Sequence, residues 1–192
     1  MTGLTEAIRR CKVKLKLDNF TEGYGNCFPN AIVQQCRRPE VKKWLLQNKP
    51  HAMFRSQQAL RREVKNFALT SQNVKVNNYR INYNETLSGL DKSWLEYWNE
   101  MQKDGTWVDS AFIQLTAWYI GLDIKILTTS SSSSEHPFII MSGNIDNIPE
   151  EEMGPPLLIG NYTNVHYQSL LPTTSIKAVS YTHLTLPTIL LV

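Results

Sequence analysis

Two glycines that run directly into a cysteine limit the fold of this chain more than any other stretch. Gly23 and Gly25 let the backbone turn sharply, and Cys27 follows almost at once. Pro29 comes two residues later, and proline is favoured in the first turn of a helix, where its missing N–H has no partner to lose. The sequence therefore predicts a tight turn followed by a helix over residues 28–35, with Cys27 at the N-terminus of that helix.

The helix N-terminus makes Cys27 a candidate nucleophile. Unpaired N–H groups and the positive end of the helix dipole favour a thiolate there, and the thiolate is the form that attacks a carbonyl carbon. The backbone amides of Gly25, Asn26 and Cys27 are natural donors to the oxyanion that such an attack creates. A free cysteine is also a common small buried side chain, so the local pattern alone leaves both interpretations open.

A thiol nucleophile needs an imidazole that accepts and returns a proton, and His166 is the strongest candidate among the four histidines. The residue pattern at 165–171 predicts a strand, in which His166 and Gln168 share one face. The other histidines lie beside prolines or in the C-terminal tail: His51, His136 and His183. An ordinary structural histidine remains the alternative for His166 taken alone.

Two short motifs and the segment between them carry a family resemblance. Residues 25–32 read Gly-Asn-Cys-Phe-Pro-Asn-Ala-Ile, and residues 161–170 contain a His-Tyr pair followed by the polar Gln168. The first motif resembles the nucleophile motif of the ovarian-tumour (OTU) cysteine proteases, usually D-G-N-C-(L/F)-F-R-A-I, and the second resembles the family's His-Tyr signature. Residues 107–127 resemble the family's middle segment. The resemblance covers residues 10–172 in the family's order. It implies an α+β, OTU-like papain-type fold with helices packed around a small, mostly antiparallel sheet.

The same resemblance implies a thiol-dependent ubiquitin isopeptidase, which is a deubiquitinase. Such an enzyme hydrolyses the isopeptide or peptide bond that follows the C-terminal Gly-Gly of ubiquitin, so the implied partner is ubiquitin or a ubiquitin chain. By the resemblance, Cys27 is the nucleophile, His166 is the base and Gln168 stands at the third catalytic position. The turn of Gly25, Asn26 and Cys27 corresponds to the oxyanion hole. The resemblance implies no cofactor and no metal.

Two positions depart from the family's pattern. The family usually has aspartate three residues before the cysteine, where this chain has Tyr24, and Asp or Asn two residues after the histidine, where this chain has Gln168. A glutamine carbonyl accepts an N–H but carries no charge. Asp18, Glu22 and Tyr24 remain as alternative third members. The two departures also support a second interpretation, a catalytically inactive domain of the same fold that binds ubiquitin or acts as a scaffold.

Cysteine usage and hydropathy predict the compartment. The chain has three cysteines (Cys11, Cys27 and Cys36), an odd number with no C-x-x-C pair and no Cys/His cluster at zinc-finger spacing. This argues for a reducing environment and against a disulfide framework or a structural zinc. An apolar leader and a run of about 18 apolar residues are both missing, so we expect neither a signal peptide nor a membrane span. The expected location is the cytoplasm or the nucleus.

Charge is unevenly distributed along the chain. Lys and Arg are concentrated in the first 75 residues, but they are spread over several expected elements and no aromatic-interleaved RNA motif accompanies them. Binding to nucleic acid is therefore not favoured, and we expect most basic side chains, including Arg61 and Arg62, to lie on solvated faces. The acidic loop at residues 146–156 could meet basic residues of a ubiquitin tail, although an ordinary solvated loop is the alternative.

Hydrophobic periodicity predicts a helical first half and a stranded second half. Helices are expected over residues 41–47 and 56–69, after a capping box at Ser93, and after a cap at Asp109 or Ser110. Extended segments are expected at residues 12–17, 122–128, 137–141, 157–160 and 165–171. Residues 70–92 are polar and are expected to form a long loop with at most one short strand.

The C-terminal end of the chain differs from the rest. Residues 178–192 contain no Asp, Glu, Lys or Arg, and residues 180–188 resemble a translated cloning or library-adaptor tail. Such segments do not take part in a fold. We therefore expect a single domain over residues 1–177 and a non-native or disordered tail over residues 178–192.

Overall fold

The computed structural model describes residues 2–11, 14–21, 23–71, 73–76, 79–82, 92–129, 137–162 and 166–173 of the 192-residue chain. In this part the helices are α1 (Thr2–Arg10), α2 (Cys27–Cys36), α3 (Pro39–Asn48), α4 (Gln57–Thr70), α6 (Trp94–Met101) and α7 (Ser110–Ile120), with short 3-10 turns η1 (Pro50–Ala52) and η2 (Glu150–Glu152). The strands are β1 (Leu15–Leu17), β2 (Asn73–Val76), β3 (Tyr79–Asn82), β4 (Ile124–Thr128), β5 (Phe138–Met141), β6 (Leu157–Tyr162) and β7 (His166–Pro172).

The main sheet has five strands in the order β1-β7-β6-β4-β5. Only the β4–β6 pair is parallel, and the other pairs are antiparallel. The first and last strands of the described chain lie side by side, with Leu17 opposite Leu170. The β6–β7 hairpin places His166 opposite Tyr162. The expected α+β fold with a small, mostly antiparallel sheet is confirmed.

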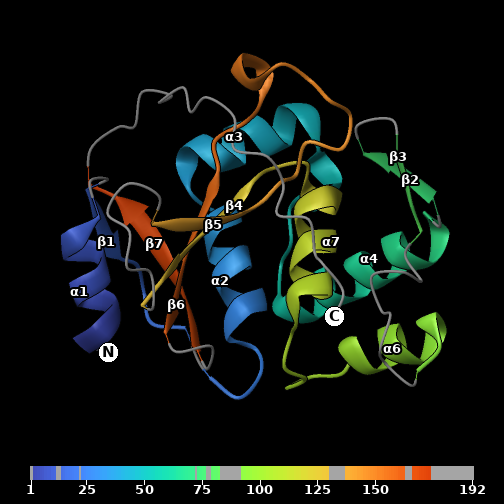
Figure 1. Ribbon diagram of the computed structural model, residues 1–192, viewed down its shortest axis with the longest axis horizontal. Coiled ribbons are helices and arrows are strands. Elements are labelled where there is room, and N and C mark those ends of the chain that lie inside the picture. The colour runs from blue at the N-terminus through green and yellow to red at the C-terminus, as the bar shows by residue number, and fades with distance from the viewer. Residues whose placement is uncertain are drawn as a thin grey trace.

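Helices cover both faces of this sheet (Figure 1). On one face, α1 packs through Leu4 and Ala7 onto Leu158 of β6 and Leu170 of β7. On the other face, α2, α4 and α7 pack with the opposite side of β4 and β6 into the larger core, whose largest buried side chain is Trp98 of α6. The period-two alternation of the strands supplies apolar side chains to both layers.

Local sequence signals set the ends of several helices as expected. Ser93 forms a capping box with Glu96 at the start of α6. Asp109 caps α7 by accepting the N–H of Phe112 at 3.0 Å. Gly121 ends α7 in the left-handed conformation, with φ of 75°. No helix of the described part of the chain combines the length and the apolar character that crossing a membrane requires.

The structure differs from the sequence-based expectation at three places. Residues 2–10 form helix α1, which we did not predict, because its few apolar residues form only a narrow stripe. The expected loop at 70–92 contains the β2–β3 hairpin, since cross-strand pairing stabilises short strands that a polar composition conceals. The acidic loop contains the 3-10 turn η2. Residues 174–192, which include the predicted tail, lie outside the described residues.

Candidate active site

The turn at residues 23–26, called the nucleophile turn after the predicted role of Cys27, leads directly into α2, whose first residue is Cys27. Tyr24 and Gly25 have φ values of 58° and 79°, so the chain passes through two successive left-handed residues. Asn26 is the N-cap residue but makes no side-chain capping bond, and its own amide donates to Gly23 O at 3.4 Å. The side chain of Asn26 therefore leaves the first amides of α2 to other acceptors. Cys27 itself is only 1% exposed.

Residues 104–106, between α6 and α7, contact this turn and fix its position. A Cβ atom on Gly25 would lie 1.9 Å from Gly105 O, so the two backbones are in direct contact. Asn26 joins them: its Oδ1 accepts the N–H of Gly105 at 3.0 Å, and its Nδ2 donates to Asp104 Oδ1 at 3.0 Å. The Asn26 side chain is thus used to fix the turn and not to cap the helix.

Arg61 of α4 is fully buried behind the turn. Its guanidinium donates to five acceptors: Thr106 O (2.6 Å), Met101 O (2.7 Å), Gly25 O (2.9 Å), Gln57 Oε1 (3.1 Å) and Asn26 Oδ1 (3.2 Å). One side chain therefore ties α4, the nucleophile turn and the segment after α6 together. The expected solvated position of Arg61 is wrong, because these carbonyl oxygens need a buried donor. Arg62, its neighbour, is exposed as expected.

The charge of Arg61 lies close to the thiol. Burial lowers the pKa of the Arg61 guanidinium from its usual value, and negative charge at Asp104 and at Cys27 opposes that shift. Burial also raises the pKa of Tyr167 in β7, and negative charge at Cys27 adds to that increase. Cys27 therefore lies between a guanidinium in α4 and a phenol in β7.

The start of α2 lies at the same end of the molecule as the start of β7, which carries His166 (Figure 1). Phe28 and Tyr167, the residues that follow Cys27 and His166, pack edge to face with ring centroids 5.2 Å apart. Further along, the Gln35 side chain donates to Ser169 Oγ and Leu170 O, each at 2.7 Å. These contacts fix α2 along β7, so that Cys27 and His166 lie at the same end of the sheet.

His166 itself is not hydrogen-bonded to the thiol within the described residues. Its Nε2 is buried and has no partner there. The imidazole is instead stacked on the ring of Phe20, with centroids 5.8 Å apart and ring planes 19° apart. Phe20 is 63% exposed, so its ring covers the imidazole from the solvent side.

The candidates for a third catalytic residue have other partners or positions. Gln168 is buried, and its side-chain amide is bonded to Asn19 and Thr21. Asp18 accepts Ser169 O–H at 2.8 Å and the N–H of Asn19 at 2.8 Å. Tyr24 is 90% exposed. Glu22 lies outside the described residues. The structure thus brings Gln168 next to the segment that precedes the nucleophile turn, and leaves Tyr24 in solvent.

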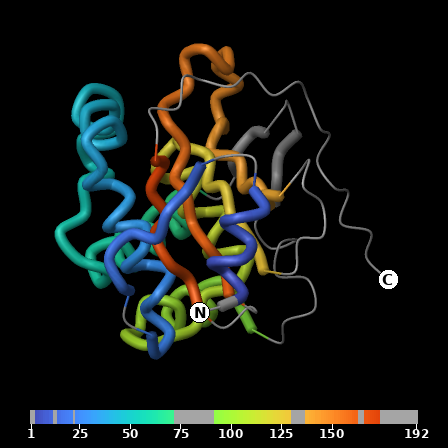
Figure 2. The backbone as a smooth tube through the Cα atoms, turned by 90° about the vertical axis from the view of Figure 1, so that its left-hand side faces the viewer, coloured from blue at the N-terminus to red at the C-terminus, as the bar shows by residue number. Residues whose placement is uncertain are grey.

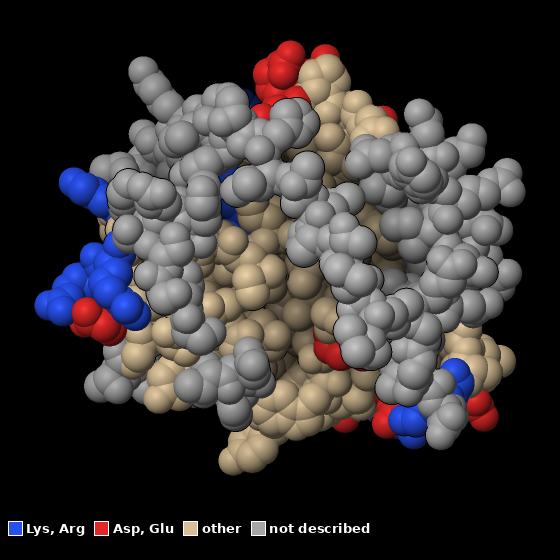
Figure 3. All heavy atoms as spheres, viewed as in Figure 1, with Lys and Arg blue, Asp and Glu red and all other residues tan. Residues whose placement is uncertain are grey.

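The acidic turn η2 lies far from the end of the sheet where α2 and β7 begin. It occupies the end of the molecule opposite the starts of α2 and β7 in both views (Figures 1 and 2). Figure 3 shows acidic side chains gathered at that end, where Glu150, Glu151 and Glu152 are located. The expected contact between this loop and a substrate tail bound at Cys27 does not fit this placement.

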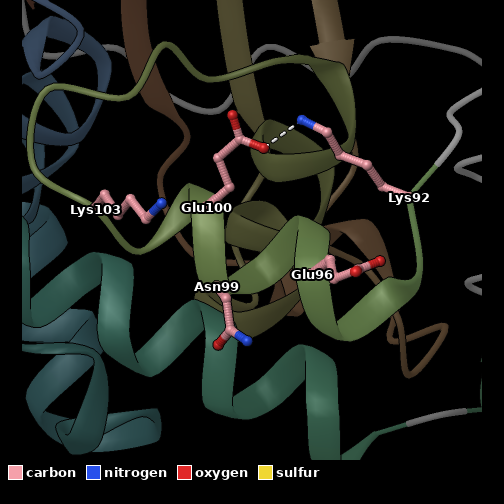
Figure 4. A pocket seen from close by; sticks show the side chains of 5 residues that line it. All are labelled: Lys92, Glu96, Asn99, Glu100 and Lys103. Carbon is pink, nitrogen blue, oxygen red and sulfur yellow. Dashed lines mark hydrogen bonds and ion pairs between the residues drawn. The ribbon is translucent and has the colours of Figure 1, made fainter.

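A hollow lies on the surface of α6. Lys92, Glu96, Asn99, Glu100 and Lys103 line it, and Lys92 forms an ion pair with Glu100 (Figure 4). Its polar, open lining contains no nucleophile. Within the ranges that the structure describes, no three His, Cys, Asp or Glu side chains are grouped so that they could hold a metal ion.

Two residues of this site were missed from the sequence. Arg61 lies three residues before Val64 and seven before Ala68, so the helical spacing that identifies the buried side of α4 includes it. We nevertheless expected Arg61 on a solvated face, because its side chain is charged. Phe20 had no such signal, because a single aromatic residue in an irregular segment predicts neither burial nor a partner.

Solved structures of OTU domains share this architecture. The OTU domain of OTUD1 has a TM-score of 0.54 and 14% identity, over 87% of this chain and 90% of that one. An OTU deubiquitinase from Wolbachia pipientis wMel bound to ubiquitin has a TM-score of 0.52 and 12% identity, over 82% and 96%. An OTU domain in complex with ubiquitin has a TM-score of 0.51 and 17% identity, over 81% and 69%. The sequence matches no protein-family model and no curated protein. The arrangement of helices and strands is therefore that of OTU domains, and this chain has the OTU fold.

Proposed function

We propose that the domain is a thiol-dependent ubiquitin isopeptidase in which Cys27 is the nucleophile and His166 the base. The observation that carries this proposal is the contact between α2 and β7. In an OTU fold, it brings a cysteine at an uncapped helix N-terminus to the same end of the sheet as a histidine at the start of a strand. Two solved structures with this fold are bound to ubiquitin, one of them described as a deubiquitinase. That supports ubiquitin, or a ubiquitin chain, as the partner.

The chemistry follows from the positions of the side chains. The Cys27 thiolate attacks the carbonyl carbon of the isopeptide bond, and the carbonyl oxygen becomes an oxyanion near the free amides at the start of α2. The imidazolium of His166 then gives its proton to the departing lysine amine, and the C–N bond breaks to leave a thioester on Cys27. A water molecule then gives a proton to His166 and attacks the thioester carbon. The C–S bond breaks, which releases the C-terminus of ubiquitin as a carboxylic acid that ionises and returns Cys27 as a thiolate. No cofactor enters these steps.

The proposal includes a reducing compartment, the cytoplasm or the nucleus, where a thiol nucleophile stays reduced. In support, no disulfide joins the three cysteines, all of which lie in the described part of the chain.

A ubiquitin probe with a C-terminal electrophile tests the proposal. We expect covalent labelling of the wild type, and no labelling of Cys27→Ala. His166→Ala should label much more slowly, because the imidazole assists deprotonation of the thiol. Cys36→Ala serves as the control for thiol count and should label like the wild type. Labelling that survives in Cys27→Ala would overturn the assignment of the nucleophile.

The second candidate is an inactive domain that binds ubiquitin through the same fold. Three features favour it: Cys27 is almost fully covered, His166 Nε2 is buried without a partner among the described groups, and Gln168 is bonded elsewhere. Measuring ubiquitin binding and the hydrolysis of a fluorogenic ubiquitin amide beside the labelling separates the two candidates. Saturable binding of ubiquitin with a wild-type hydrolysis rate equal to that of Cys27→Ala would establish the inactive domain and reject the isopeptidase.

A further inference from the structure

We propose that Phe20 is the residue that positions the His166 imidazole, and that Gln168 acts through Phe20 by fixing the segment that carries it. This inference rests on the proposed function and adds to it the element that replaces the family's orienting carboxylate. Phe20 and Gln168 are positioning residues here, because neither is required to touch the substrate.

The side chain of Gln168 clamps the two residues on either side of Phe20. Its Nε2 donates to Asn19 O. Its Oε1 accepts the Thr21 hydroxyl at 3.1 Å and the Thr21 N–H at 3.3 Å. The single hydrogen of the Thr21 hydroxyl is shared between Gln168 Oε1 and Tyr167 O, which lies nearer at 2.8 Å. The backbone of residues 19–21 is therefore held against β7 on both sides of Phe20.

Because these bonds fix the backbone on both sides of Phe20, they restrict where its ring can lie, and the ring lies over His166. The two rings are stacked at 5.8 Å with nearly parallel planes. Offset stacking at this distance is an attractive arrangement for aromatic pairs. Within the described residues the Gln168 amide bonds to Asn19 and Thr21 and not to the imidazole, so its contacts fix this segment and do not orient His166 directly.

The surroundings of His166 show why a stacking partner matters. A hydrogen bond to an orienting carboxylate would fix the ring, but Nε2 has no partner in the described part of the chain. Asp18, one of the alternative third members, is bonded to Ser169 and to Asn19 N. The aromatic face of Phe20 is the ring contact that the structure gives the imidazole.

Kinetics with a fluorogenic ubiquitin amide test the role of Phe20. We expect Phe20→Ala to lower kcat about 10-fold with KM changed less than about twofold, because an imidazole that is less well placed slows proton transfer without changing ubiquitin binding. Phe20→Tyr keeps the ring and should restore most of the rate. Leu95→Ala removes a side chain of similar exposure from α6 and should have no effect. A Phe20→Ala enzyme as fast as the wild type, or faster, overturns the proposal.

Substitutions at Gln168 separate the clamp from a direct catalytic role. Gln168→Glu supplies a carboxylate two residues after the histidine but loses the N–H donor to Asn19 O. A direct orienting role predicts a faster enzyme, whereas the clamp predicts a slower one. Thr21→Val removes one of the bonds to Gln168 Oε1 and should lower kcat in the same direction. A faster Gln168→Glu enzyme would reject the clamp.

A spectroscopic readout does not depend on activity. The ring current of Phe20 should shift the Cε1–H and Cδ2–H resonances of His166 upfield in the wild type, and Phe20→Leu and Gln168→Glu should both return them toward the values of an unstacked histidine. If these resonances do not move, the positioning proposal fails. If they move while wild-type hydrolysis equals that of Cys27→Ala, the stack is real and the isopeptidase proposal fails instead.

Discussion

The alpha carbon of Gly25 faces the carbonyl oxygen of Gly105 so closely that a single added methyl carbon would lie 1.9 Å from that oxygen. Gly105 is itself left-handed, with φ of 75°. Two glycine turns from distant parts of the chain are therefore stacked backbone on backbone. This contact fixes the distance between the nucleophile turn and the segment between α6 and α7.

Gly25→Ala should damage both stability and activity. The left-handed backbone costs a residue with a side chain about 1–2 kcal/mol, and the clash with Gly105 O adds to that cost. Chemical denaturation and probe labelling measure the two effects. Gly23→Ala is the matched control, because no atom lies within 4 Å of a Cβ there, and it should be nearly neutral. Equal stability of the two variants would contradict the packing described above.

Arg61→Leu should lower the free energy of unfolding by about 3 kcal/mol or more. It leaves the carbonyl oxygens of Gly25, Met101 and Thr106 buried without their donor. Arg61→Lys keeps the charge but cannot reach five acceptors from one ammonium, so an intermediate loss is expected. Arg62→Leu, one position on, removes an exposed guanidinium and should change stability by less than about 0.5 kcal/mol. Urea unfolding of the three variants gives the comparison.

Two adjacent glutamines in α2 should respond in opposite ways to the same substitution. Gln35→Leu removes the bonds to Ser169 Oγ, Leu170 O and Leu158 N, and should destabilise the domain by about 2 kcal/mol or more. Gln34→Leu removes a buried oxygen that has no partner in the described ranges, and should be neutral or stabilising. Thermal melts of both variants test the pair, and a large loss for Gln34→Leu would show that its oxygen is in fact bonded.

Stability should fall in alkaline solution because of Cys36. Burial raises the pKa of the Cys36 thiol from 9.0 to about 12. Between these values the folded chain keeps the proton while the unfolded chain loses it, so the thiol's contribution to stability is complete below pH 9 and is lost as pH rises toward 12. The slope from this group approaches about 1.4 kcal/mol per pH unit.

Unfolding of the wild type and Cys36→Ala at pH 8 and at pH 10 isolates this effect. The difference in stability between the two proteins should shrink at the higher pH, because only the wild type loses the contribution of the thiol. The buried tyrosines are present in both proteins and cancel in the comparison. A constant difference across this range would show that Cys36 does not titrate as described.

How far the sequence predicts this molecule depends on the range of each interaction. The start of α2, the capping box at Ser93 and the end of α7 at Gly121 follow from residues within one helical turn of each boundary, so local rules predict them. Helical spacing places Arg61 on the buried side of α4, but the carbonyls that accept its hydrogen bonds lie 36 to 45 residues away, and no local pattern identifies them.

The candidate site divides in the same way. The motifs predicted Cys27 and His166 as site residues, and the structure places the start of α2 and the start of β7 at the same end of the sheet. The partners of Gln168 are main-chain and side-chain groups of Asn19 and Thr21, and these could not be predicted because they depend on how the entry segment lies along β7. The motif position indicated a catalytic role, but the contacts of the amide depend on the tertiary fold.

The pairing of β1 with β7 also determines when the site can form. Thr21 and Gln168 are 147 residues apart, so the nucleophile turn leaves the ribosome long before the strand that carries His166 and Gln168. Pairings of such high sequence separation are also slow to form once the chain is complete. During synthesis the chain therefore carries Cys27 without His166 beside it, and the proposed cleavage of ubiquitin cannot begin until β7 has been inserted between β1 and β6.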